Sequence, residues 1–164
     1  MPDAYKILLV EDQEDDVYLF KLRLKNAKQF TLAWHVVDGA EALDYLQGTG
    51  AYRDREKYPF PDLMVLDLNL PKMNGFEVLQ GIQGKFANLK VGIFTTSEDS
   101  RDMERALGLG AHLFQTKTFE RMALCDFYIG CKSWPQPREE SSKSCKMRKT
   151  QRLNPPRCAR PTKD

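Results

Sequence analysis

The chain has 164 residues, enough for one well-buried domain and too few for two ordinary domains. Its formal charge of +2 conceals a division after Cys131: residues 1–131 carry 15 Lys and Arg against 20 Asp and Glu, whereas residues 132–164 carry 10 against 3. No run of about 18 apolar residues could span a bilayer and no charged-then-apolar leader opens the sequence, so we expect a cytoplasmic protein.

Four cysteines lie late in the chain. They are Cys125, Cys131, Cys145 and Cys158, with irregular spacing, no CxxC pair and no neighbouring histidine. This pattern does not favour a zinc site, and we expect reduced thiols.

Five short apolar runs alternate with polar, helix-compatible stretches. The runs cover residues 6–10, 31–37, 63–68, 91–96 and 111–116. Several are continuously apolar (ILLV, LMVL, VGIF), which is typical of strands covered on both faces, as in a parallel sheet. Helices are predicted over residues 14–28, 39–47, 75–84 and 99–109, where apolar residues recur at i, i+3 and i+4. The pattern predicts a doubly wound α/β domain with a five-stranded parallel sheet and ligands at the carboxyl ends of the strands.

Three other segments are irregular. Residues 48–61 are rich in Gly, Pro, Tyr and charge, and we expect a surface loop there.

Phe119, Met122 and Ala123 begin the pattern of a fifth helix, but Asp126 interrupts it, so we expect an atypical last helix. We assign residues 1–130 to the domain and residues 131–164 to a basic tail rich in Pro, Ser, Lys and Arg, with too little apolar surface to fold. An altered reading frame or a lineage-specific extension could explain this tail.

Three acidic residues follow two of the predicted strands. Glu11 and Asp12 come directly after ILLV, and Asp67 ends LMVL, so their carboxylates project from the same edge of a parallel sheet. Such a cluster is tolerable only if some carboxylates stay protonated or a divalent cation lies among them. Mg²⁺ fits if Asp12 and Asp67 bind it directly, Glu11 acts through water and the main-chain carbonyl of Asn69 completes the shell. Alternatively, Glu11 and Asp12 are ordinary strand-end acids or helix caps. Asp67 requires a positive partner, because it ends an apolar strand at the centre of the sheet.

Four segments in order, LLVED, LMVLDLNLPKMNGFEVL, FTTS and AHLFQTK, resemble the motifs of two-component response-regulator receiver domains. The resemblance covers residues 6 to about 120 and implies the flavodoxin-like fold of that family. The EDQEDD opening, the VVDGAEALDYL segment and the YRDREKYPFPD loop are similar to the stand-alone receivers associated with bacterial phytochromes.

The resemblance implies that Asp67 is the phosphoacceptor and that Glu11 and Asp12 hold Mg²⁺. Attack by a carboxylate on phosphorus needs neutralisation of the phosphoryl charge by a metal and a fixed cation, and Lys117, at the end of the fifth predicted strand, is the candidate cation. A single lysine at a strand end is otherwise a solvated surface charge.

The resemblance also implies a conformational switch. Thr95 would bind a phosphoryl oxygen through its hydroxyl, although the neighbouring Thr96 is an alternative donor and β-propensity alone explains both threonines. Phe114 occupies the position of the family's switch aromatic, and the alternative is a core phenylalanine. Phosphorylation would shift the population between two packings.

One departure from the family stands beside the candidate cation. Thr118 occupies the place where receivers usually have a proline, commonly with a cis bond, directly after the lysine. This replacement raises the question of whether phosphorylation is slowed.

These features predict a single-domain response regulator that accepts a phosphoryl group from a sensor histidine kinase, such as a phytochrome, and signals to a downstream protein partner. We expect no enzymatic activity beyond self-phosphorylation from small donors and autodephosphorylation. The sequence leaves a homodimer open. It does not favour binding of nucleic acid through the tail. The alternative is a pseudo-receiver that docks partners without phosphate. A phosphohydrolase with an aspartyl intermediate is disfavoured, because Asn69 stands where such enzymes usually have a second acid.

Overall fold

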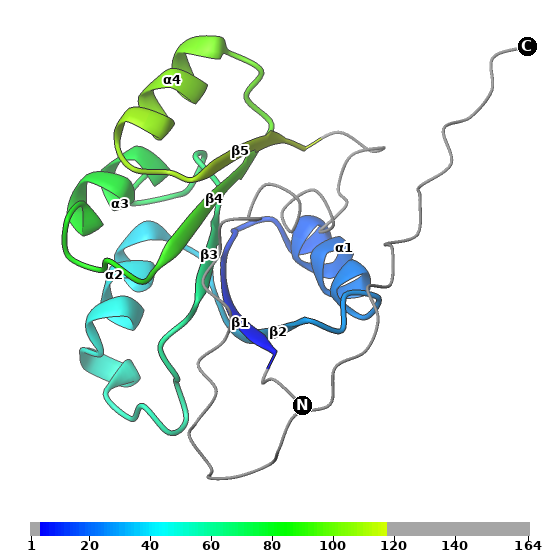
Figure 1. Cartoon of the computed structure of the whole chain (residues 1–164), viewed down its shortest axis with the longest axis vertical. Helices are drawn as coiled ribbons and strands as arrows, with labels where there is room; N and C mark the ends of the chain where they lie inside the picture. Colours follow the sequence, from blue (N-terminus) through cyan, green and yellow to red (C-terminus); the bar gives the residue numbers. More distant parts are fainter. Residues whose placement is uncertain (1–3, 118–164) are drawn as a thin grey trace, which may run out of the picture.

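A computed structural model describes residues 4–117, which form a five-stranded parallel sheet with helices on both faces (Figure 1). The order in the sheet is β2-β1-β3-β4-β5. The strands are β1 (Tyr5–Val10), β2 (Phe30–Val36), β3 (Leu63–Leu66), β4 (Lys90–Thr95) and β5 (Leu113–Thr116). The expected flavodoxin-like α/β fold is confirmed. The expected last helix, the tail and Thr118 all lie outside the described residues.

Four α-helices connect the strands: α1 (Glu14–Leu24), α2 (Gly39–Gln47), α3 (Gly75–Ile82) and α4 (Ser100–Gly108). The expected span of α2 agrees with the structure, whereas α1 ends four residues before the expected residue 28. Asp38 and Asn74 begin α2 and α3 by accepting hydrogen bonds from backbone N–H groups in the first helical turn. Asn74 and Glu77 form a complete capping box, which explains why α3 begins directly after the β3 loop.

The sheet has a separate apolar core on each face. On one face, α2, α3 and α4 cover residues such as Leu8, Met64 and Ile93, and on the other α1 covers residues such as Ile7 and Val65 (Figure 1). Alternate residues of β1 and β3 therefore enter different cores, as the continuously apolar runs predict. This double coverage fixes the strands whose carboxyl ends carry the acidic residues.

The loop between α2 and β3 is mostly exposed, as expected, but two of its aromatic side chains are buried. It contains a short 3₁₀ helix, η1 (Gly50–Tyr52), and the side chains of Tyr52 and Tyr58 are buried in the core on the α2 side. The Arg55 guanidinium donates hydrogen bonds to the carbonyls of Tyr45 and Leu46 at the end of α2, at 2.8 Å each. Polar aromatic residues can be buried here because the loop returns to the helix, where Arg55 donates to carbonyl groups at the end of α2.

The loop after β3 packs tightly over the strand end. A Cβ atom added to Gly75 would lie 2.5 Å from the carbonyl oxygen of Asp67 and 2.8 Å from the Cα of Leu68. Both obstructing atoms belong to the backbone and cannot rotate away, so only glycine allows this approach. The close packing keeps the loop beside Asp67.

We expect Gly75→Ala to lower the free energy of unfolding by about 2 kcal/mol or more, because the methyl group forces the loop away from the strand. Gly108→Ala is the matched control, since a Cβ at this position in α4 meets no atom within 4 Å. The control should keep or slightly raise stability, because alanine favours helix. Urea unfolding of both variants checks this, and equal stabilities would contradict the packing described.

An ion pair joins this loop to the start of α2. Lys72 Nζ lies 2.6 Å from Asp38 Oδ2, and the Asp38 side chain is buried whereas that of Lys72 is exposed. Lys72 has φ 61°, a left-handed conformation that a side chain disfavours. The contact with Asp38 offsets part of this strain.

Asp38→Asn should destabilise the protein mainly above the titration range of the carboxylate. Burial raises the pKa of Asp38, but hydrogen bonds from Lys72 and from the amides of Glu41 and Ala40 together lower it by more. The pKa of Asp38 therefore lies below its ordinary value. A pKa lowered by folding contributes stability that is present above the ordinary pKa and is lost as the pH falls through the folded pKa. Asparagine keeps the helix cap. We expect lower stability than wild type at neutral pH and a smaller difference below about pH 4; a urea unfolding series that gives the same difference at every pH would refute this.

Candidate functional site

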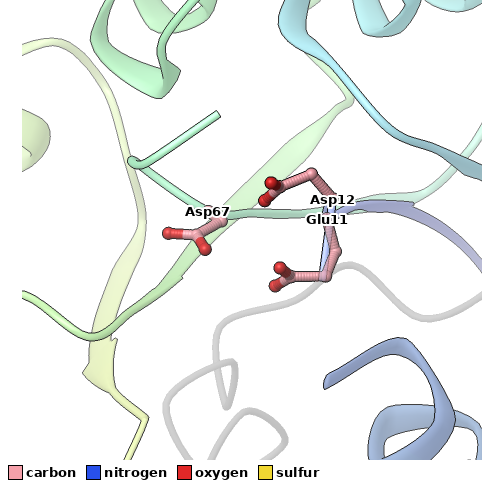
Figure 2. A group of neighbouring side chains, drawn as sticks. All are labelled: Glu11, Asp12 and Asp67. Atoms are coloured by element: carbon pink, nitrogen blue, oxygen red, sulfur yellow. The ribbon is translucent and has the colours of Figure 1, made fainter. Parts of the chain in front are cut away.

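The register of the sheet brings the acidic residues of two strands together. Val10 pairs with Leu66, so the residues that follow, Glu11 and Asp67, leave adjacent strands at one edge. The Asp67 N–H donates to the carbonyl of Val10 at 3.1 Å and continues the ladder. Figure 2 shows Glu11, Asp12 and Asp67 gathered at the ends of β1 and β3. Glu11 and Asp67 are only 2% and 4% exposed, so their charges require compensation.

Lys117 supplies a positive charge among these acids. Its backbone N–H donates to the carbonyl of Thr95 at 2.7 Å, which fixes the end of β5 against β4. Its side chain is 6% exposed, and Nζ donates to Asp67 Oδ2 at 2.7 Å and to Glu11 Oε2 at 2.6 Å. The lysine expected to face Asp67 does so.

Burial and ion pairing change the pKa values of Glu11 and Lys117 in different ways. Burial raises the pKa of Glu11, and the hydrogen bond from Lys117 only partly opposes this effect. Burial lowers the pKa of Lys117, but its hydrogen bonds to Asp16, Asp67 and Glu11 together raise it by more. The pKa of Lys117 therefore lies above its ordinary value. The lysine is therefore a permanent cation at neutral pH.

The carboxylates also fit a divalent cation. One oxygen from each of Glu11, Asp12 and Asp67 lies within 4.8 Å of the others. Asp12 Oδ1 is buried and has no hydrogen-bond partner among the residues that the structure describes. A buried carboxylate oxygen without a donor is costly, and a hard cation such as Mg²⁺ would satisfy it.

Asn69 lies beside the same carboxylates. Its backbone N–H donates to Asp67 Oδ1 at 3.1 Å, so Asn69 and Lys117 bind different oxygens of Asp67 and fix the orientation of the carboxylate. The role of the Asn69 carbonyl as a metal ligand stays a prediction.

The two candidate threonines differ in their surroundings. Thr95 is fully buried and its hydroxyl accepts the N–H of Ser97 at 3.3 Å. Thr96 is exposed and its hydroxyl accepts the Asn69 side-chain amide at 3.4 Å. Both lie near the acidic edge, and the choice between them as phosphoryl donor stays a prediction.

Phe114 lies on the same sheet face as Thr95. It pairs with Ile93 in the β4–β5 register, two residues before Thr95, and its half-buried ring packs on the core beneath α2, α3 and α4. A change at Thr95 can thus reach Phe114 along one face of the sheet. The geometry is compatible with the expected switch and equally with a core phenylalanine.

Sequence reasoning missed one member of the site. Asp16, in the first turn of α1, accepts a hydrogen bond from Lys117 Nζ at 2.8 Å. Its position four residues after Asp12 was a weak signal, because acidic residues are common in the first turn of any helix.

The comparison with protein families defines the class of this protein. Residues 7–128 match the model of the response regulator receiver domain, so the chain belongs to that family. Receiver domains are signalling domains of two-component systems and bind a divalent metal at an acidic pocket.

The similar proteins include regulators associated with phytochromes. The chain is 36% identical to response regulator Rcp1 of Synechocystis over 117 residues, which are 68% of this chain and 76% of Rcp1. The structure of the phosphorylated cyanobacterial phytochrome response regulator RcpA is similar at 32% identity with a TM-score of 0.67, covering 80% of this chain and 94% of that one. The Mn²⁺-bound form of Rcp1 is similar at 34% identity with a TM-score of 0.65, covering 79% and 93%. The chain spans less than half of longer relatives such as the transcriptional regulator KdpE of Mycobacterium tuberculosis, 44% of whose length it covers at 30% identity.

Within residues 4–117, every helix is too short or too polar to cross a membrane.

Proposed function

We propose that this protein is a response regulator that accepts a phosphoryl group on Asp67 with the help of Mg²⁺ and Lys117. The observation that carries this proposal is the contact of Lys117 Nζ with Asp67 Oδ2 at 2.7 Å inside a buried cluster of carboxylates. A fixed cation beside a nucleophilic carboxylate is what transfer of a phosphoryl group requires.

The residues divide the chemistry between them. One Asp67 oxygen attacks phosphorus, the bond from phosphorus to the donor breaks, and an acyl phosphate forms. Bound Mg²⁺, held by Asp12 and Asp67 with Glu11 acting through water, would neutralise the phosphoryl oxygens. Lys117 offsets the negative charge that accumulates on the same group, and Asn69 holds Asp67 through its amide.

The output is a change of packing along the sheet. In this proposal, the Thr95 hydroxyl leaves the Ser97 amide for a phosphoryl oxygen, and Phe114 turns toward the space that Thr95 vacates. The two residues share one sheet face, which supports such a coupling. The added charge of about −1.5 to −2 drives the population shift.

The donor is a sensor histidine kinase. Similarity to Rcp1 and to a phytochrome response regulator favours a phytochrome as that kinase. We expect both proteins to act in the cytoplasm. The signal then passes to a downstream protein partner.

The proposal is tested by incubating the protein with acetyl phosphate and Mg²⁺ and measuring intact mass. Wild type should gain one phosphoryl group, and Asp67→Asn, which keeps the shape of the side chain, should gain none. Chelation of the metal should stop uptake by the wild type. An unchanged mass for folded wild type would favour the pseudo-receiver.

A further inference from the structure

Lys117 is shared by three carboxylates from three different elements. Its Nζ donates to Glu11 after β1, to Asp67 after β3 and to Asp16 in the first turn of α1, at 2.6, 2.7 and 2.8 Å. An ammonium group has three hydrogens, so these bonds use all of its donors.

Asp16 differs from the other two partners. Glu11 and Asp67 belong to the group of carboxylates that could hold a metal, whereas that group does not include Asp16. The Asp16 side chain is 28% exposed, against 3% for Glu11 and 5% for Asp67. Asp16 therefore lies at the border of the pocket, and within residues 4–117 its side chain bonds to the lysine and not to the metal cluster.

Metal binding would change the partners that are available to the Lys117 ammonium group. A cation between the carboxylates competes with Lys117 for Glu11 and Asp67, and the repulsion between the two cations pushes the ammonium group away. Asp16 lies outside the metal cluster and keeps its bond to Lys117. Without Asp16, the ammonium group would have to remain on the metal's own carboxylates or lose its partners in a buried place, which is costly.

We propose that Asp16 is a positioning residue that holds Lys117 beside Asp67 while the metal occupies the acidic pocket. The inference rests on the proposed function, because it assumes that Glu11, Asp12 and Asp67 bind the metal. Its consequence is that Asp16 strengthens metal binding without being a metal ligand, and that it does so through Lys117.

The test measures Mg²⁺ affinity of the full chain by isothermal titration calorimetry. Asp16→Asn should raise the Kd for Mg²⁺ about fivefold to tenfold, the size expected for coupling between contacting groups. Asp15→Asn is the matched control: Asp15 is exposed in the same helical turn, and its replacement removes the same charge. The control should change the Kd by less than about twofold, since exposed charges are screened. Equal effects of the two substitutions would overturn the inference.

A double-variant cycle then tests the route through the lysine. In a Lys117→Met background, Asp16→Asn should change the Kd no more than Asp15→Asn does. A loss of affinity that persists without the lysine would overturn the inference, because Asp16 would then act on the metal directly.

Phosphate uptake separates this inference from the proposed function. If wild type takes up phosphate but Asp16→Asn binds Mg²⁺ as tightly as Asp15→Asn, the proposed function stands and the role of Asp16 is refuted. If the coupling between Asp16 and Lys117 is found but Asp67 takes up no phosphate, the proposed function fails instead.

Discussion

Replacing Lys117 with methionine is expected to lower the free energy of unfolding of the metal-free protein by about 3 to 5 kcal/mol at neutral pH, the usual cost of leaving buried charges without a partner. The substitution removes an ammonium group that contacts three carboxylates, two of which, Glu11 and Asp67, have side chains at most 5% exposed. These carboxylates would then repel each other in a buried place. Methionine keeps the length of the side chain, so the loss measures the charge more than the packing.

Mg²⁺ should restore much of this stability, because a divalent cation replaces the missing positive charge. The gain in unfolding free energy on adding MgCl₂ should therefore be larger for Lys117→Met than for wild type. Lys85→Met, a substitution of an exposed lysine, is the control and should behave like wild type. Urea unfolding with and without the metal measures all three proteins, and a Lys117→Met variant as stable as wild type without metal would contradict the ion pairs described.

The second large effect is expected from Asp12→Asn. This substitution replaces a carboxylate whose Oδ1 is buried without a hydrogen-bond partner among residues 4–117. Loss of a group that only supports a metal ligand weakens metal binding by about 10- to 100-fold. Since Asp12 is a proposed direct ligand, we expect the Kd for Mg²⁺ to rise by more than this. The metal-free variant should be more stable than wild type by about 1 kcal/mol, because one of three neighbouring negative charges is gone.

Calorimetric titration and metal-free unfolding together decide the role of Asp12. Weaker metal binding with greater stability is the signature of a residue kept for function at the expense of stability. Unchanged affinity would show that Asp12 is an ordinary strand-end acid, the alternative that its position after β1 left open.

The sheet and the meeting of its acidic ends follow from local sequence features. Continuous apolar runs in β1 and β3 require cover on both faces, and parallel strands place the residues after Val10 and Leu66 at one edge. The positions of Glu11, Asp12 and Asp67 were predictable on these grounds. The approach of Lys117 was predictable only through the order of motifs in a known family, since nothing in the AHLFQTK segment itself indicates which way its last side chain points.

Other contacts depend on tertiary packing that no local pattern records. Asp16 reaches Lys117 because α1 packs on one face of the sheet with this side chain turned toward the strand ends, and that rotation follows from how Val17 and Phe20 fill the core. The burial of Tyr52 and Tyr58 likewise depends on a return of the loop to α2 that Arg55 stabilises. A polar composition correctly indicated a loop but not where its aromatic rings would pack.

The most direct test of the central claim locates the phosphoryl group. After reaction with acetyl phosphate and Mg²⁺, borohydride reduction converts an aspartyl phosphate to homoserine, and peptide mass spectrometry identifies the converted position. We predict conversion at position 67 and at no other acidic residue. Homoserine at position 12 or 16, or hydroxynorvaline at position 11, with Asp67 intact would contradict the assignment of Asp67 as the acceptor.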